Sequence, residues 1–477
     1  GVPIVIDILA NDTDPLGPLS PPSNTSSYSI TVIESPRHGV AVVENQKIKY
    51  TPDNVAGDVT LTYKINNGVD SNTAIVTITV TYNQYLGKVL VDKLGDDGTT
   101  QPGDRTLREA LGLVGSDGIT GIAFDDSLIG QTITLSSALG PIVIDKDVVI
   151  DGGNAVTISG GGETSIFKIT SGNVVIKNIT LRDGLSKGGK GGGASGSVNS
   201  GKSHAPGGGG AGMGGALAIR NGNVSIESVS FIDNKAIGGN GGNANVLEVI
   251  WQQRPGYAAG TMDPVDYSGY GGGSVFASGG SRTPWGNSAG GRNGGLGGGG
   301  GGSINYSSGD GGGTGGFGGG GGGGDGGAFK GKGGSIRGIG GSGGAFAGNG
   351  GNGSGTNSSG QVPTGFYASN ETISGGGGGG AGLGGAVFIY EGVLSIKDSD
   401  FKNNEALGGT GGPGASWASG RDATSLGDGD GSYGQGVGGA IFVCETGNIT
   451  FGDNVTFSGN SAQTDNADAY IMHLDIS

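Results

Sequence analysis

The sequence predicts an all-β protein in two parts, a small β-sandwich followed by a parallel β-solenoid that carries glycine-rich insertions. Residues 1–82 alternate between apolar and polar over about seven short runs, as the half-buried strands of a sandwich do. Beyond them, one unit of three short apolar runs recurs, and such a unit cannot bury its apolar face without stacking on a neighbour. Glycine accounts for 116 of the 477 residues, without the strict three-residue period with proline that marks collagen.

Turn-forming clusters separate the predicted strands of residues 1–82. In the first cluster, Asp12 and Asp14 could bind calcium through their carboxylates. The alternative is an Asx-turn that ends the first strand, because aspartate side chains often bond their own backbone in turns. Both interpretations stay open from the sequence.

Four segments of this first part carry a resemblance to a known family. The segments are ILANDTDP (8–15), PRHGV (36–40), IKYTP (48–52) and LTYKINNG (61–68). Together they resemble the cadherin-like tandem repeat of large bacterial surface proteins. The resemblance implies an Ig/cadherin-like sandwich over residues 1–82, of the kind that serves as a spacer in secreted adhesins.

Residues 83–103 are expected to be a linker, and residues 104–184 a capping helix with the first coils. Leu107, Ala110, Leu111 and Val114 fall at helical spacing, with Asp104 placed as the N-cap. A solenoid needs such a cap, because its first coil would otherwise expose an apolar end and unpaired strand edges.

An ordered set of segments within residues 88–184 carries a second resemblance. The segments are TLREAL (106–111), GIAFD (121–125), QTITL (131–135), VVIDG (148–152) and VTISG (156–160). They are similar to the N-terminal part of secreted bacterial right-handed parallel β-helix proteins, of the polymorphic outer-membrane protein and filamentous adhesin type. The resemblance implies that fold and a surface location, but no activity, because the architecture hosts many functions.

The repeated unit also locates the insertions. Its clearest copy reads GLGGAVFI (382–389), GVLSI (392–396) and NEA (404–406), and further copies begin at residues 212 and 436. Within residues 185–477, glycine-rich insertions at 185–212, 238–382 and 408–436 all leave shortly after the same place in the repeat, the Asn-x-Ala turn or, for the first, Asp183-Gly184, and return at Gly-Gly-Ala. Equivalent positions stack in a solenoid, so the insertions are expected on one side.

Two interpretations of the insertions remain open. Glycine-rich sequence defaults to flexible linkers, yet glycine also permits extended chains to approach closely, as in a polyglycine-II bundle. The longest insertion holds an aromatic-rich patch that either contacts a ligand or pins the loop to the solenoid. The candidate contact residues are Trp251, Tyr257, Tyr267, Tyr270 and Trp285.

Composition constrains the partners and the location. A net charge of −15 makes nucleic acid a poor partner and suits an extracellular role, with calcium as a natural counter-ion. No apolar run approaches the roughly 20 residues of a transmembrane helix. The abrupt start inside a strand suggests a fragment or processed product, and Cys444, the single cysteine, cannot form an intramolecular disulfide.

No catalytic set is evident, so the protein is not expected to be an enzyme. Asp398 and Asp400 are expected to alternate along one strand, on a solvated face. Asp428 and Asp430 resemble a calcium loop superficially but lack the ligand spacing of an EF-hand. The three histidines are widely separated, and no cofactor is indicated beyond possible calcium at Asp12, Asp14, Asp428 and Asp430.

The sequence therefore predicts an extracellular structural or adhesive protein of a bacterial cell surface. It is expected to be a self-assembling fibre, sheath or matrix component, or part of a large adhesin. Its expected partner is itself, with polysaccharide or a host or cell surface as further candidates. The strand at residues 1–9 and the last coil at residues 470–477 could mediate assembly. The alternative is a β-helix that binds or cleaves carbohydrate through a groove near residues 251–285.

Overall fold

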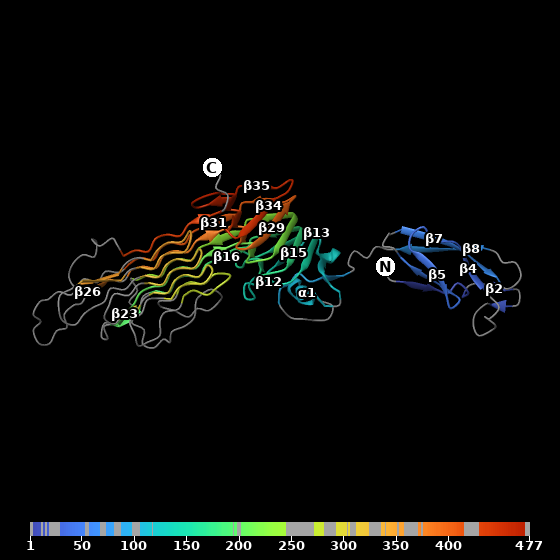
Figure 1. Cartoon of the computed structure of the whole chain (residues 1–477), viewed down its shortest axis with the longest axis horizontal. Coiled ribbons are helices and arrows are strands. Elements are labelled where there is room, and N and C mark those ends of the chain that lie inside the picture. The colour runs from blue at the N-terminus through green and yellow to red at the C-terminus, as the bar shows by residue number, and fades with distance from the viewer. Residues whose placement is uncertain are drawn as a thin grey trace, which may run out of the picture. The chain divides into compact units, whose positions relative to one another are not determined.

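The computed structural model shows a chain that is nearly all β and divides into two compact units, Gly1–Leu86 and Gly87–Ser477. Figure 1 shows the strands of both units. The described residues are 3–10, 13–14, 17–18, 29–52, 57–66, 73–80, 87–97, 105–116, 118–193, 195–197, 202–244, 271–280, 292–302, 304–305, 312–323, 335–338, 340–350, 353–356, 371–373, 375–414 and 429–472.

The N-terminal unit contains two antiparallel three-stranded sheets, in the orders β1-β6-β5 and β4-β7-β8. Ile48, Tyr50 and Leu61 are almost fully buried and form one core with residues from both sheets. The strands are β1 (Ile4–Ile6), β4 (Ser29–Glu34), β5 (Val40–Glu44), β6 (Lys47–Thr51), β7 (Gly57–Asn66) and β8 (Thr73–Val80), with β2 (Thr13–Asp14) and β3 (Gly17–Pro18) as a separate pair. The two sheets make the expected sandwich.

The second unit begins earlier than the sequence suggested. Strand β9 (Lys88–Val91) pairs in parallel with β10 (Gly121–Phe124) and belongs to the same sheet, so residues 83–103 are not a linker throughout. Val89 and Val91 are buried in the core of this unit. A four-residue alternating strand is short enough to be mistaken for connecting chain.

Helix α1 (Leu107–Leu113) buries Leu107, Ala110 and Leu111, as their spacing predicted. Its N-cap, however, is Thr106 and not Asp104, which lies outside the described residues. The Thr106 hydroxyl accepts a hydrogen bond from the Glu109 backbone N–H, and the Glu109 carboxylate accepts one from the Thr106 N–H. This reciprocal capping box satisfies two otherwise unpaired donors, which places the helix start at residue 107.

In the rest of the unit, successive copies of the repeated unit, here called coils, pair strand by strand in parallel sheets. The long sheet follows the order β34-β29-β21-β15-β13-β10-β9, the six-stranded sheet the order β12-β14-β20-β28-β33-β37, and the four-stranded sheet the order β16-β22-β31-β36. Pairing aligns the repeats as the sequence does, since Leu217 pairs with Val387 and Val387 with Ile441. The periodic copies are therefore consecutive layers of one structure.

The bounds of these elements are as follows. The long sheet contains β13 (Val148–Ser159), β15 (Asn173–Arg182), β21 (Asn223–Ile232), β29 (Gly392–Lys397) and β34 (Gly447–Phe451), with β11 (Thr132–Thr134), β30 (Asp400–Lys402) and β35 (Thr456–Ser458) beside them. The six-stranded sheet contains β12 (Ile142–Ile144), β14 (Phe167–Ile169), β20 (Leu217–Ile219), β28 (Val387–Ile389), β33 (Ile441–Val443) and β37 (Ala469–Ile471). The four-stranded sheet contains β16 (Leu185–Lys187), β22 (Lys235–Ile237), β31 (Glu405–Leu407) and β36 (Ser461–Ala462). A 3₁₀ turn covers Asp126–Leu128.

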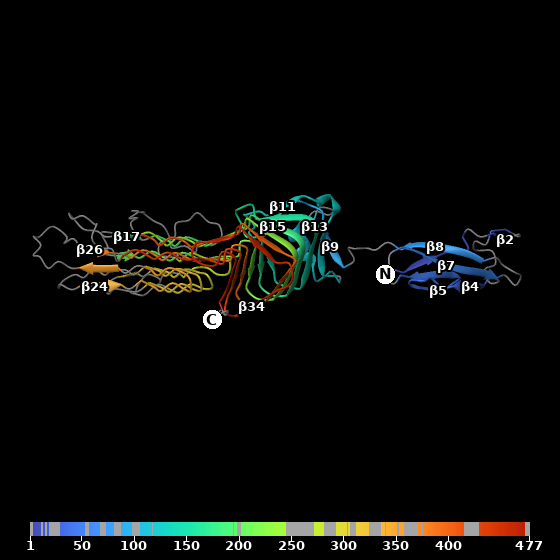
Figure 2. The same cartoon turned by 90° about the horizontal axis from the view of Figure 1, so that it is seen from above.

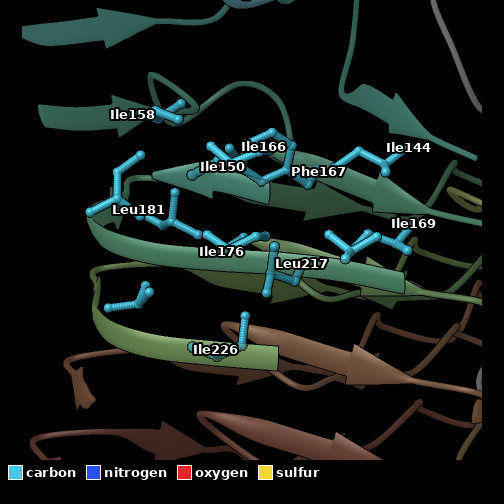
Figure 3. Close-up of a cluster of buried hydrophobic side chains, with 14 of the residues drawn as sticks. Ile144, Ile150, Ile158, Ile166, Phe167, Ile169, Ile176, Leu181, Leu217 and Ile226 are labelled. Carbon is cyan, nitrogen blue, oxygen red and sulfur yellow. The ribbon is translucent and has the colours of Figure 1, made fainter. Parts of the chain in front are cut away.

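Columns of identical or similar side chains fill the interior of the stack. Ile150, Ile176 and Ile226 come from successive strands of the long sheet and lie one above another (Figure 3). Phe231 and Phe401 stack with ring centroids 4.6 Å apart. Burial of one face of each strand, repeated at every coil, supplies the apolar core that a single coil lacks.

An asparagine column closes one corner of the stack. The side-chain amide of Asn234 donates to Asn404 Oδ1, and that of Asn404 donates to Asn460 Oδ1, each at 3.0 Å. The amide of Asn460 in turn donates to Asp468 Oδ1. These are the asparagines of the repeated Asn-x-Ala turn, and the two innermost are fully buried with their polar groups satisfied.

Asp398 and Asp400 do not alternate along one strand. Asp398 has a φ of 49° and sits in the turn between β29 and β30, where its carboxylate accepts a hydrogen bond from the Asn454 side chain. Asn178, Ser228 and Asn454 occupy the equivalent positions with φ values of 53–57°, the first two within the continuous strands β15 and β21. Asparagine and aspartate tolerate this left-handed conformation better than most residues, which explains their recurrence there.

The insertions run side by side from one side of the stack, as both views show (Figures 1 and 2). Three outgoing segments follow β16, β22 and β31; they are residues 188–193, 238–244 and 408–414. Three returning segments precede β19 (Gly212–Met213), β27 (Gly382–Leu383) and β32 (Gly436–Val437); they are residues 205–211, 375–381 and 429–435. Those last three strands pair in parallel, so the insertions leave and return at the predicted corner.

The long insertion adds further glycine-rich segments between residues 271 and 350. Short antiparallel strand pairs also lie within the first and the long insertion, namely β17 (Ser195–Ser197) with β18 (Lys202–His204), β18 with β23 (Ile304–Asn305), β24 (Ser335–Gly338) with β25 (Gly353–Thr356), and β25 with β26 (Glu371–Ile373). The described glycine-rich segments outside these pairs are not β-strands, yet their backbones are extensively hydrogen-bonded.

Hydrogen bonding among these segments has a three-residue period. In the first returning segment, Gly208, Gly209 and Gly210 donate at 2.8 Å to three different segments, through the oxygens of Gly300, Gly378 and Gly189. Three residues before Gly210, Gly207 donates to Gly192 and so returns to the segment that holds Gly189. A Cβ atom added at Gly208, Gly209 or Gly210 would overlap a carbonyl oxygen of yet another segment, so each of these three positions requires glycine.

Candidate functional site

Among the described residues, an aromatic column lies on the outer face of the six-stranded sheet. Register places Lys168, Ala218, Phe388, Phe442 and Tyr470 in line across five successive strands. Phe388 and Phe442 are fully buried although they point away from the stack interior. Something outside the sheet therefore covers them.

The cover consists of apolar turns of the glycine-rich segments. The ring centroids of Phe276 and Phe388 lie 6.0 Å apart. The Phe442 centroid lies 6.1 Å from that of Phe317 and 5.2 Å from that of Phe346. Phe346 also reaches Tyr470 at 5.4 Å. The turns thus dock in the order of the coils, with edge-to-face or tilted geometry that favours aromatic pairs.

Lys168 marks the N-terminal end of this aromatic column. Its Nζ atom lies 5.7 Å from the centroid of the Phe276 ring, within the range of a cation–π contact. Burial lowers the pKa of Lys168, and the nearby Arg220 charge lowers it further. Lys168 therefore helps to place the first docked turn at the first strands of the sheet.

A ladder of alternating charges lies on the outer face of the long sheet. Register aligns Asp151, Lys177, Glu227 and Lys397. Lys177 Nζ lies 3.5 Å from Asp151 Oδ2, and Lys397 Nζ lies 3.2 Å from Glu227 Oε1. If a strand paired with the next coil but one, like charges such as those of Asp151 and Glu227 would lie side by side. The ladder therefore favours pairing between consecutive coils.

Asp151 is the most strongly anchored carboxylate of this ladder. Burial acts to raise the pKa of Asp151, but hydrogen bonds from Asn178 and the Gly153 N–H, with the charges of Lys177 and Lys88, hold that pKa below its usual value. All of these partners are structural residues of the stack. The arrangement stabilises a carboxylate and offers no proton for catalysis near neutral pH.

Of the four predicted calcium residues, the structure describes only Asp14 and Asp430. Asp12 and Asp428 lie outside the described residues, and Asp14 lies in β2. Asp430 Oδ1 accepts a 2.7 Å hydrogen bond from the Gly414 backbone N–H. Within the described ranges, no group of three or more His, Cys, Asp and Glu side chains could hold a metal ion.

The five predicted ligand-contact residues, Trp251, Tyr257, Tyr267, Tyr270 and Trp285, all lie outside the described residues. Cys444 is buried beside the aromatic column, and burial raises the pKa of its thiol, so the thiolate is disfavoured. The described side chains of this cluster are largely apolar and contribute packing.

Comparison with known proteins identifies the N-terminal unit. Residues 1–81 match the family model of the bacterial Ig domain. This Ig domain agrees with the two-sheet sandwich and with the surface-protein resemblance of the sequence. Neither the comparison with curated proteins nor that with solved structures gives a match.

Sequence reasoning missed the role of Leu296, Phe317 and Phe346, whereas Phe276 belongs to the aromatic-rich patch that the sequence assigns either to ligand contact or to pinning the loop. Phe276, Leu296, Phe317 and Phe346 each sit at a turn between glycine-rich segments and pack against the outer cluster. The available signal was their spacing, one large apolar residue in each glycine tract of the long insertion. The role of Asp430 was also missed, because no sequence pattern shows which backbone N–H it would meet.

Proposed function

We propose that this chain is an extracellular structural or adhesive protein of a bacterial cell surface. The observation that carries the proposal is the bacterial Ig domain at residues 1–81, a domain typical of surface or secreted proteins. No described helix has the length and apolar character needed to cross a membrane. The proposed role is non-enzymatic and rests on shape and self-association.

The fold proposed for residues 87–477 is a right-handed parallel β-helix that mounts a polyglycine-II bundle. Parallel pairing of equivalent strands in three sheets supports the first part. The three-residue period of the glycine hydrogen bonds supports the second, because polyproline-II-type chains have three residues per turn. Within the Ig family, the cadherin-like tandem repeat is the subtype proposed from the sequence.

Hydrogen exchange tests the bundle directly. Glycine amides that donate to neighbouring segments, such as those between residues 292 and 350, should exchange more slowly than amides of free chains. Exchange at the rate of a random coil throughout residues 290–380 would eliminate the bundle and leave loops in its place.

Self-association is proposed through strand edges of the two units. Strand β1 lies at the edge of its sheet, with Val5 63% exposed, and the last coil leaves Phe451 40% exposed. Unpaired edges with apolar side chains are ready templates for pairing. Electron microscopy of the concentrated protein tests this proposal, with end-to-end contacts as the expected result and isolated particles as the contrary one.

The surface location has its own test. Antibodies against the full chain, applied to intact cells that produce it, should label the cell exterior in immunogold microscopy, and external protease should remove the label. Labelling confined to the cytoplasm would refute the proposal. Calcium remains a proposal for the residues named above, and a change in melting temperature on chelation would support it.

A further inference from the structure

Each later outgoing segment is held from two sides by the coil before it. The third accepts from the second outgoing segment, since the Gly241 N–H donates to the Thr410 carbonyl at 2.8 Å. It also donates to the second returning segment, from the Gly409 N–H to the Gly380 carbonyl at 2.8 Å. The second outgoing segment is held by the first coil in the same two ways. The place of an outgoing segment is therefore defined by donors of one earlier segment and acceptors of another.

The third coil presents the same set of groups, which we call the fourth position. Its donors are the N–H groups of Gly408, Gly411 and Gly414, three residues apart. Its acceptors are the carbonyls of Gly431 and Gly434, in the places of the acceptors one coil earlier. Among the described residues, the Gly411 N–H donates to no acceptor and these two carbonyls receive no donor. The fourth position thus offers an extended segment both donors and acceptors.

Side chains satisfy the other two donors of the fourth position. Gly408 donates to Gln463 Oε1 at 2.6 Å. Gly414 donates to Asp430 Oδ1 at 2.7 Å. Continuing the register of β31 with β36 aligns Gln463 with Leu407, whose backbone carbonyl accepts the corresponding hydrogen bond one coil earlier. Both side chains lie at the surface and occupy places that the carbonyls of a further segment would take.

Tyr433 stands on the third returning segment where the first two have glycine, at Gly209 and Gly379. A Cβ atom at Gly209 would overlap the Gly239 carbonyl of the next outgoing segment. A Cβ atom at Gly379 would overlap the Gly409 carbonyl of the next outgoing segment in the same way. By this equivalence the Cβ atom of Tyr433 projects into the fourth position, and Tyr433 is 67% exposed there.

We propose that the fourth position is a docking site for one extended glycine-rich segment of another chain, and that Tyr433 keeps it closed. Such a segment supplies carbonyls at three-residue spacing for the donors and N–H groups for the two free carbonyls. The Cβ atom of Tyr433 lies where the backbone of that segment would run. Tyr433 thereby limits the bundle to its own coils, as side chains on a sheet edge limit the addition of strands. The inference rests on the polyglycine-II bundle proposed above and concerns its growth.

The test supplies the missing segment within the full-length chain. A second copy of residues 408–435 is inserted directly after Gln463, where an outgoing segment would leave the last coil. Attachment gives the inserted segment a high effective concentration, so docking does not depend on a weak encounter between two molecules. Hydrogen exchange at single-residue resolution is then measured for the original Gly411 amide, with Tyr433 and with Tyr433→Gly. This amide should exchange about tenfold or more slowly in the Tyr433→Gly chain.

Two controls separate the Cβ overlap from other effects of the substitution. Tyr433→Ala in the grafted chain removes the ring but keeps the Cβ atom, so the Gly411 amide should exchange as fast as it does beside Tyr433. Tyr433→Gly without the inserted segment should also leave this amide exchanging fast, because no carbonyl then reaches it. Slow exchange of Gly411 in the grafted Tyr433→Gly chain alone is the expected pattern.

Two results overturn the proposal. Slow exchange of Gly411 in the grafted chain with Tyr433 or Tyr433→Ala would show that Tyr433 does not close the fourth position through its Cβ atom. Fast exchange in every chain would show that the position takes no segment.

The amides of Gly377 and Gly380 are paired in the second returning segment and report separately on the bundle. Their exchange at the rate of a random coil in the unaltered protein would refute the bundle itself. If the grafted chain fails to fold, Tyr433→Gly without the graft is measured with and without a synthetic peptide of residues 405–414 at millimolar concentration. The peptide should slow exchange of the Gly411 amide, and unchanged exchange would overturn the proposal.

Discussion

Replacement of Phe388 by alanine should detach the glycine-rich segments while the stack stays folded. The Phe388 side chain is fully buried on the outer face of β28, whereas its neighbours Val387 and Ile389 point into the stack core. It touches Phe276 and Phe317 from the insertion and stacks on Phe442 at 5.8 Å. Truncation therefore removes contacts between the stack and the glycine-rich segments and leaves the contacts inside the stack in place.

The expected loss follows from this burial. Phenylalanine-to-alanine changes at fully buried sites cost about 3–5 kcal/mol, part of which is the cavity left behind. This amount is a large fraction of the roughly 5–15 kcal/mol that stabilises a whole domain. If the cost of the substitution falls only on the docking of the glycine-rich segments against the stack, amide exchange between residues 292 and 350 should rise by about 100-fold or more.

Hydrogen exchange with mass spectrometry gives the readout, and Phe401→Ala is the matched control. Phe401 is equally buried but lies inside the stack, between Phe231 and Phe457. Its truncation should raise exchange in β21 and β30 first. Equal exchange profiles for the two variants, or unchanged exchange of residues 292–350 in Phe388→Ala, would refute the docking argument.

Three further predictions concern glycine, asparagine and aspartate. Gly209→Ala should lower stability by about 1–3 kcal/mol in chemical denaturation, because its Cβ would overlap the Gly239 carbonyl, while Gly112→Ala in α1 has open space and should stabilise by up to about 1 kcal/mol. Asn404→Ala should lower the melting temperature sharply, because it leaves several buried groups unpaired at about 1–3 kcal/mol each. A melting temperature equal to that of the wild type would contradict the stabilising role of the asparagine column. Asp151 has a lowered pKa in the folded state, so its contribution is present above the unfolded value of about 3.9 and is lost as pH falls through the folded value. Asp151→Asn should therefore flatten that acid-induced loss of stability, measured by urea titrations at a series of pH values below the unfolded value.

Much of the stack could be predicted because its side chains carry the information. Leu217, Val387 and Ile441 are aligned by the repeat and pair in the structure. The corner from which the insertions leave follows from the same alignment. Strand β9 was missed because four alternating residues differ little from a linker, and the cap was misplaced because Asp104 and Thr106 are both competent caps.

The glycine-rich segments were harder to predict for a physical reason. Glycine has no side chain, so a tract such as residues 297–302 contains no pattern that specifies its neighbours. The docked turns supply that information, since Phe317 and Phe346 fix where each tract begins relative to a coil. Asp430 illustrates the remaining difficulty, because its partner Gly414 is one glycine among many in the sequence.

The three-residue hydrogen-bond period restricts how the insertions can change in length during evolution. Deleting one residue from a returning segment would rotate every later N–H by about 120°, toward a different neighbour. Deleting three residues would return each N–H to the same neighbouring segment, shifted along it by three residues. Insertions and deletions within the paired parts of these tracts should therefore accumulate in multiples of three, whereas strands of the stack tolerate changes by two because their side chains alternate. Length variation among related chains would thus record which glycines are paired, even where the residues themselves are indistinguishable.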